Sequence, residues 1–199
     1  MNLESLTTSL EGGVATVRLS RPDKANAMNL AMWQDIRTAF RWADETPEVR
    51  VAILEGEGKH FTSGIDLQML MGLGAQIRNA CDGRTRENLR RMVLDLQDML
   101  SSIERCRKPV LAAIHGGCIG GGVDLVCCAD IRYASADAYF VIKEIDIGMT
   151  ADVGTLQRNL QPDQLTQAQA QLLINQRFKL LEALAGPGRN DGRRCVGVR

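Results

Sequence analysis

The sequence predicts an α/β fold with parallel strand pairing, built as one domain with an appended tail. Three observations lead to this prediction. Strand-like and helix-like segments alternate along the chain, an order typical of parallel sheets. The chain has 199 residues, of which 45% are hydrophobic, so it can bury a sizeable core. We find no internal repeat in the sequence, so one domain is the simplest organisation.

The first half of the chain contains two predicted strands and a predicted helix. Residues 14–20 alternate between apolar and polar side chains and end at the polar turn RPDKAN, as in a half-buried strand. From Asn29, which suits an N-cap, apolar residues recur at helical spacing until Pro47. Residues 49–56 (VRVAILEG) form the next predicted strand, which leads into a loop that carries HFTSGIDL.

The second half predicts a long helix followed by several strands. Residues 85–106 carry one apolar stripe that we expect to lie in the core: Leu89, Met92, Val93, Leu96, Met99, Leu100 and Ile103. Pro109 ends this helix, and the apolar run VLAAIH after it is typical of a buried strand. A glycine-rich segment follows directly, and DIRYAS and AYFVIKEIDIG predict further strands.

Charge and cysteine usage exclude several classes of protein. The 24 basic residues balance the 24 acidic residues, which argues against nucleic acid or a membrane surface as partner. The six cysteines form no C-x-x-C pair and no ordered spacing with the two histidines, so we expect no metal site and no disulfide framework. The N-terminal residues resemble no targeting signal, and no window reaches membrane-spanning length, so we expect a cytoplasmic protein.

Five glycines lie within residues 116–122, and they call for a physical reason. Their spacing does not fit a dinucleotide fingerprint, and Val123 and Asp124 stand where a P-loop needs lysine and serine or threonine. The remaining interpretation is a strand that turns through glycines into a helix beginning near Gly121, whose free N–H groups form an anion or oxyanion site. Tight packing of this helix against a neighbour is the alternative. Asp124 shares a helix face with Gly121, which favours the functional interpretation.

Three long motifs resemble one known family. GKHFTSGIDL, KPVLAAIHGGCIGGGVDL and ADIRYASADAYFVIKEIDIGMTADVGTLQR are similar to the crotonase (enoyl-CoA hydratase/isomerase) superfamily, and within it to the Δ3,5-Δ2,4-dienoyl-CoA isomerases. The similarity runs from about residue 12 to 158. It implies a crotonase-like spiral of ββα repeats and an oxyanion hole made by the backbone N–H groups of Ile65 and Gly121. It also implies a substrate-binding set: Ser63, Gly64, Ile65, Asp66, Leu67 and Gly121.

The resemblance also implies an activity and its catalytic residues. The substrate is an acyl-CoA thioester in fatty acid β-oxidation, with coenzyme A as part of the substrate and no separate cofactor. Glu144 and Asp152 become the acid/base pair that moves a 3,5-diene to the 2,4 position, with Glu144 favoured for the C2 proton, while Asp124 is an ionised or hydrogen-bonding neighbour. For Asp152, a role as helix N-cap is the structural alternative.

A hydratase of this superfamily would carry glutamate at positions 124 and 144 and an uncharged residue near 152, so the sequence departs from that pattern at two of three places. Asp146 is expected to be structural or solvated, and His115, at a strand end, is expected to be a hydrogen-bonded core residue rather than a base. The segment RPDKANAM (residues 21–28) resembles the family segment near the adenine of CoA, and its basic side chains either face phosphates or are solvated.

The end of the chain departs from the family. We expect a core over residues 1–158 and an atypical tail over 159–199, helical at about 163–184 and disordered after 186. The family forms homotrimers or hexamers, and the tail leaves assembly open here. Two alternative functions follow: an enoyl-CoA hydratase, against which the carboxylates argue, and an inactive, truncated chain that binds acyl-CoA, for which the tail argues.

Overall fold

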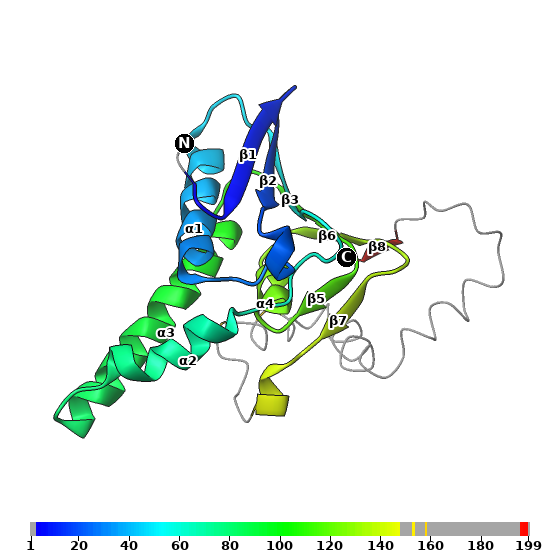
Figure 1. Ribbon diagram of the computed structural model, residues 1–199. Helices are drawn as coiled ribbons and strands as arrows, with labels where there is room; N and C mark the ends of the chain where they lie inside the picture. The colour runs from blue at the N-terminus through cyan, green and yellow to red at the C-terminus, as the bar shows by residue number, and fades with distance from the viewer. Residues whose placement is uncertain (1–2, 148–152, 154–157, 159–195, 199) are drawn as a thin grey trace.

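The computed structural model describes residues 3–147, 153, 158 and 196–198 (Figure 1). In this part of the chain the main sheet has the strand order β1-β2-β3-β4-β6-β8. Its strands are β1 (Leu6–Glu11), β2 (Val14–Leu19), β3 (Val51–Gly56), β4 (Val110–Ile114), β6 (Ile131–Ala134) and β8 (Val196–Val198). Strands β2, β3, β4 and β6 pair in parallel, whereas β1 and β8 pair antiparallel at the two edges. The predicted α/β class with parallel pairing is therefore confirmed.

A second, smaller sheet pairs β5 (Gly117–Ile119) with β7 (Tyr139–Val141) in parallel. The sequence predicted a longer strand through residue 148, but β7 ends at Val141 and a 3-10 turn, η2 (Glu144–Ile147), follows it. The reason is that the partner strand β5 ends at Ile119, where Gly120 turns the chain, so no backbone is left for β7 to pair with. This early end to the strand brings Glu144 into a turn.

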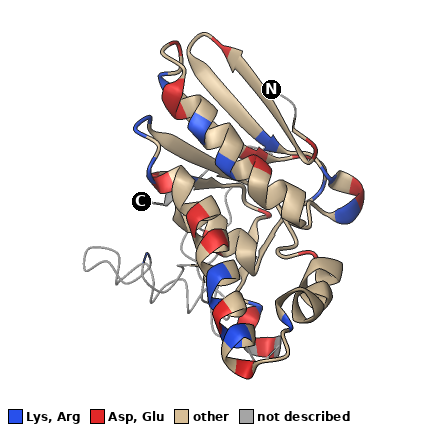
Figure 2. Cartoon of the chain, turned by 90° about the vertical axis from the view of Figure 1, so that its left-hand side faces the viewer, with Lys and Arg blue, Asp and Glu red and all other residues tan. Residues whose placement is uncertain are grey.

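Two helices cover one face of the main sheet (Figures 1 and 2). Helix α1 (Leu30–Glu45) begins where predicted, because the side chain of Asn29 accepts a hydrogen bond from the N–H of Met32 at 2.9 Å. It packs against α3 (Asp82–Glu104) and buries six residues of its inner face: Met32, Trp33, Ile36, Ala39, Phe40 and Ala43. These side chains form the centre of the hydrophobic core.

The first half of α3 extends past the sheet alongside α2 (Leu67–Ile77), as Figure 1 shows. The predicted core stripe of α3 is therefore wrong at its start, since Leu89 is 44% exposed while Leu96, Met99, Leu100 and Ile103 are buried. Only the second half of the helix reaches the sheet. No element was predicted for residues 68–77, which form most of helix α2, and its apolar residues Leu67 and Met71 are exposed.

The tail is described only at its end. Residues 163–184, for which a helix is predicted, lie outside the described residues. Residues Val196–Val198 pair with β6, so the predicted disorder after residue 186 is wrong at these three positions. The open edge of β6 supplies the backbone N–H and C=O groups for this pairing.

Basic and acidic residues are interspersed along α1 and α3 (Figure 2), and several pair across elements. Arg37 of α1 lies 2.9 Å from Asp95 of α3, and Arg107 lies 2.9 Å from Asp44. None of the described helices is long and apolar enough to cross a membrane. Within the same residues, no group of three or more His, Cys, Asp or Glu side chains is arranged to hold a metal ion.

Candidate active site

Gly121 is the first residue of helix α4 (Gly121–Cys127), as the sequence predicted. Its N-cap, Gly120, has φ 51° and ψ −122°, a conformation that residues with a Cβ rarely adopt. The two predicted oxyanion donors lie close together. A Cβ placed on Gly121 would be 3.9 Å from the nitrogen of Ile65, and one on Gly64 would be 3.4 Å from the nitrogen of Gly121.

The direction of both N–H groups is fixed by the carbonyl of the same peptide. The oxygen of Gly64 accepts a hydrogen bond from Met28 at 2.8 Å, and the oxygen of Gly120 accepts one from Val123 at 2.7 Å. In a planar trans peptide the N–H points opposite to the C=O. The N–H groups of Ile65 and Gly121 therefore point to the side opposite the carbonyl oxygens of Gly64 and Gly120. Neither N–H has a hydrogen-bond partner among the described residues. Two such donors are what an oxyanion site requires.

Two other glycines of the segment, Gly116 and Gly122, permit close packing. A Cβ on Gly122 would overlap the methyl group of Thr62, and one on Gly116 would overlap the backbone oxygen of Lys59. Gly121 differs, because its Cβ would meet Trp33 at an ordinary contact distance of 3.7 Å. The packing alternative thus describes Gly122, whose helix packs against Thr62, while Gly116 allows a close approach of two backbone segments and the backbone of Gly121 supplies a free donor.

Backbone hydrogen bonds join the two segments that carry the donors. Phe61 donates to the oxygen of His115 at 2.9 Å, and Ile119 donates to the oxygen of Thr62 at 3.1 Å. The side chain of His115 is hydrogen-bonded as expected, with Nε2 lying 2.9 Å from the oxygen of Gly58, but the residue is half-buried and lies outside the core. The relative position of the Ile65 and Gly121 N–H groups is therefore held by regular pairing between the segments.

Glu144 lies beside the start of α4. Its Oε1 atom is 3.4 Å from the Cβ position of Gly120, and its side chain is half-buried. Asp146, only two residues away, is exposed and pairs with Lys143 at 2.7 Å, as expected for a solvated residue. The two acidic residues of η2 therefore lie in different environments, Glu144 beside the start of α4 and Asp146 in solvent. Asp152, the second predicted acid/base residue, lies outside the described residues.

Asp124 is fully buried in the first turn of α4. The expectation that the Asp124 carboxylate faces the two donor N–H groups stays a prediction.

Two buried cysteines near Asp124 are not reactive thiols. Burial raises the pKa of Cys118 well above its usual value, and the neighbouring Cys127 and Asp124 raise it further. Burial likewise raises the pKa of Cys128 to about 12. These two thiols are therefore protonated at neutral pH and unsuited to act as nucleophiles.

The predicted substrate-binding segment, residues 63–67, ends at the first residue of α2. Ser63 donates its N–H to the oxygen of Ala25 at 2.9 Å, and Leu67 is the exposed first residue of α2. Asp66 is the N-cap of this helix, since its Oδ1 accepts a hydrogen bond from Gln68 at 2.9 Å. Ser63 and Asp66 therefore have structural roles in this segment. Their contact with substrate stays a prediction.

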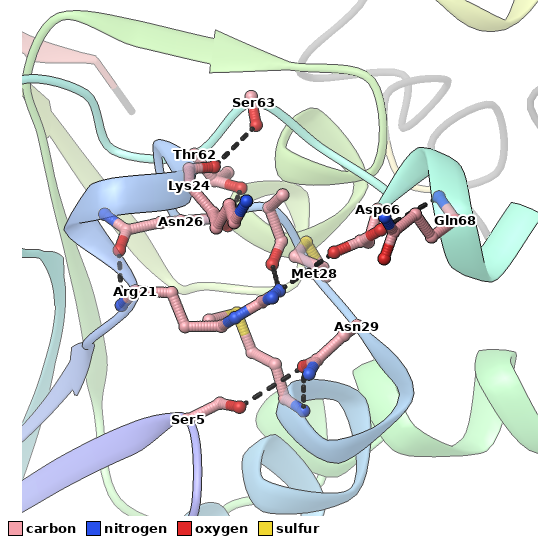
Figure 3. Close-up of polar contacts among 12 residues, drawn as sticks. Ser5, Arg21, Lys24, Asn26, Met28, Asn29, Thr62, Ser63, Asp66 and Gln68 are labelled. Carbon is pink, nitrogen blue, oxygen red and sulfur yellow. Dashed lines mark hydrogen bonds and ion pairs between the residues drawn. The ribbon is translucent and has the colours of Figure 1, made fainter.

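Arg21 pairs with Asp66 at 3.1 Å and also donates to the oxygen of Ala27 (Figure 3). Burial raises the pKa of Asp66, but hydrogen bonds from Arg21, Gln68 and Met69 outweigh this effect and hold the pKa below its usual value. Arg21 was considered as a CoA phosphate contact or as a solvated charge. These contacts join residues 21–28 to the segment that carries Ile65, and a contact of Arg21 with a CoA phosphate stays a prediction.

The comparisons with known proteins agree with this geometry. Residues 9–185 match the family model for enoyl-CoA hydratase/isomerase. The chain belongs to this family. It is 47% identical over 157 residues to the peroxisomal Δ(3,5)-Δ(2,4)-dienoyl-CoA isomerase of Arabidopsis thaliana, which covers 78% of this chain and 56% of that protein. The mitochondrial enzyme of the same name from Mus musculus is 48% identical over 158 residues, 79% of this chain and 48% of that protein. The chain therefore spans about half the length of these relatives.

Solved structures of the family share the fold. An enoyl-CoA hydratase/carnithine racemase from Magnetospirillum magneticum superposes with a TM-score of 0.72 at 32% identity, covering 87% of this chain and 61% of that structure. The crotonase-like α/β fold expected from the motifs is therefore confirmed.

Sequence reasoning missed two residues of this family member that build the donor site. Asn26 and Thr62 are both fully buried and polar. Asn26 donates to the oxygen of Phe61, and the Thr62 hydroxyl donates to the oxygen of Asn26 and accepts from the N–H of Gly64. Asn26 has φ 53°, in the left-handed region that asparagine tolerates better than most residues. An asparagine at the end of the turn RPDKAN is a signal for such a conformation, but the three carbonyl groups that its Nδ2 faces are 31 to 35 positions away and leave no local pattern.

Proposed function

We propose that this chain is a dienoyl-CoA isomerase that converts a 3,5-dienoyl-CoA to the 2,4-dienoyl-CoA. The observation that carries the proposal is the pair of neighbouring N–H groups of Ile65 and Gly121, directed away from protein acceptors, with the carboxylate of Glu144 beside the same helix start. The names and identities of the relatives from Arabidopsis thaliana and Mus musculus support the reaction.

In the proposed mechanism, the thioester oxygen accepts hydrogen bonds from Ile65 and Gly121. Glu144 removes a proton from C2, and the negative charge of the resulting dienolate develops on that oxygen. Asp152 then delivers a proton to C6, so that one C–H bond breaks, another forms, and both double bonds shift without oxidation or reduction. Each N–H donor contributes about 3–4 kcal/mol to stabilising the transition state. Asp124 stays a neighbour that tunes the protonation of the two acidic residues.

The pattern of acidic residues distinguishes this proposal from hydration. A hydratase handles one water between two glutamates, whereas here a buried aspartate stands at position 124 and a third acidic residue at position 152. Transfer between C2 and C6 needs carboxylates at opposite ends of a conjugated system. The remaining alternative is a chain that binds acyl-CoA without turnover, and the assay below distinguishes it from the isomerase.

An absorbance assay with octa-3,5-dienoyl-CoA and the 199-residue chain tests the proposal. We expect absorbance of the conjugated 2,4-dienoyl thioester to appear with time and to depend on enzyme concentration. Hydration of a 2-enoyl-CoA without diene isomerisation would overturn the proposal in favour of a hydratase. Binding of the dienoyl-CoA without turnover would overturn it in favour of an acyl-CoA-binding chain.

The biological setting belongs to the proposal as well. We propose a place in fatty acid β-oxidation, where unsaturated acyl chains supply such dienes. The two relatives are named as peroxisomal and mitochondrial proteins, and the cytoplasmic location predicted for this chain stays a prediction. Assembly into a homotrimer or hexamer also stays a prediction.

A further inference from the structure

We propose that Asn26 and Thr62 are positioning residues that hold the N–H of Ile65 in the direction needed to bind an acyl thioester oxygen. The inference rests on the proposed oxyanion role of Ile65, and it assigns a function to two buried polar side chains that lie outside the acid/base machinery. Figure 3 shows Asn26 in the turn after β2 and Thr62 in the segment that leads into α2, where the two residues contact each other.

The side chain of Asn26 ties two segments together. It is fully buried, and its Oδ1 accepts a hydrogen bond from the N–H of Arg21 at 2.9 Å. Its Nδ2 faces three backbone oxygens, those of Glu57 at 2.8 Å, His60 at 3.0 Å and Phe61 at 3.1 Å. A single amide group thus donates hydrogen bonds to three carbonyl groups of the segment that precedes Thr62. Aspartate would have the same shape but no hydrogen to donate.

The hydroxyl of Thr62 continues this network to the donor peptide. It donates to the backbone oxygen of Asn26 at 2.7 Å and accepts from the N–H of Gly64 at 3.1 Å. Both functions of the hydroxyl are therefore used, and both partners are buried. Valine has nearly the same shape as threonine but would leave the N–H of Gly64 without this acceptor.

Gly64 is held at both ends of its backbone. Its N–H bonds to Thr62, and its C=O accepts from Met28 at 2.8 Å. The next N–H along the chain is that of Ile65, which belongs to the same planar peptide as this C=O. With φ 87°, Gly64 has a conformation that its lack of a side chain permits, and hydrogen bonds rather than side-chain sterics hold it there. Loss of the Thr62 hydroxyl therefore leaves this peptide freer to rotate.

A matched set of variants tests the positioning role. Thr62→Val removes the hydroxyl, Thr62→Ser keeps it, and Asn26→Asp replaces the donor at the other end of the network. Ile36→Val, in the buried face of α1, serves as a control that weakens packing away from the site. Each variant is measured for its melting temperature, for kcat and KM, and for the infrared C=O stretch of bound 2,4-dienoyl-CoA labelled with carbon-13 at the thioester.

We expect Thr62→Val to move the C=O band toward its position for the free thioester in water and to lower kcat on the order of tenfold, with a smaller change in KM. Asn26→Asp should act in the same direction, while Thr62→Ser should keep the wild-type band. Ile36→Val should lower the melting temperature without moving the band. A wild-type band in folded Thr62→Val, or an equal band shift in Ile36→Val, would overturn the inference and leave a purely structural role.

The infrared measurement needs binding but no turnover, so it separates this inference from the proposed reaction. If the wild-type chain shifts the C=O band of the bound thioester and Thr62→Val loses that shift, the positioning role stands even when no diene is isomerised. If the wild-type chain binds the thioester without shifting the band, Ile65 polarises no carbonyl and the positioning inference is overturned.

Discussion

Glu144→Gln is expected to lower kcat for diene isomerisation by about 10²- to 10⁴-fold, because glutamine keeps the size of the side chain but cannot accept the C2 proton. This loss corresponds to about 3–5 kcal/mol of transition-state stabilisation. Glu144 is half-buried beside Gly120, so the substitution should leave the fold intact. Steady-state rates with octa-3,5-dienoyl-CoA measure the effect.

Asp152→Asn should lower kcat by a similar factor in the same assay. The substitution removes the carboxyl group that delivers the proton to C6, but asparagine can still cap a helix.

Asp146→Asn is the matched control for this experiment. Asp146 lies in the same turn as Glu144 but is exposed and paired with Lys143. We expect its replacement to change kcat by less than about twofold, since exposed ion pairs contribute little. Equal losses in Glu144→Gln and Asp146→Asn would contradict the assignment of Glu144, because a general perturbation of the turn would then explain both.

Gly122→Ala should destabilise the chain by about 1–3 kcal/mol, because the new methyl group would overlap the methyl group of Thr62 in the interior. Gly121→Ala, one position earlier in the same helix, should cost much less stability, since its Cβ meets Trp33 at an ordinary 3.7 Å. Thermal unfolding of the two variants measures the difference. If Gly122→Ala loses less stability than Gly121→Ala, Gly122 does not pack closely against Thr62 and the described contact is contradicted.

The double variant Thr62→Ser, Gly122→Ala sharpens this test. Serine lacks the methyl group that blocks position 122, while Cβ of residue 62 remains at 3.7 Å from the added atom and the hydroxyl stays available. We therefore expect Gly122→Ala to cost less than about 1 kcal/mol in the Thr62→Ser background, because alanine also favours the helical state over glycine. Additive losses in the double variant would place the clash elsewhere.

Much of the framework could be predicted from local pattern. Alternating residues predicted β2, and helical spacing after the cap at Asn29 predicted α1, because in both cases one face is buried and the other is solvated. The glycine segment predicted a helix that starts at Gly121, since a strand followed by several glycines can turn sharply without steric cost.

The parts that could not be predicted depend on contacts between distant residues. The apolar stripe of α3 is continuous in sequence, yet Leu89 is exposed because the sheet ends before the helix does. The length of β7 depends on where its partner β5 ends, which no local pattern encodes. The role of Asn26 depends on carbonyl groups 31 to 35 residues away. Likewise, the motif identified Ile65 and Gly121 only through a family resemblance, and spacing alone could not bring them together.

A crystal structure of the chain with bound 2,4-dienoyl-CoA tests the oxyanion site most directly. We expect the thioester oxygen to lie within about 3.2 Å of both the Ile65 and the Gly121 nitrogens, with the acyl chain passing the carboxylate of Glu144. A thioester oxygen that contacts neither nitrogen, with the acyl chain bound elsewhere on the protein, would contradict the proposed site and the reaction built on it.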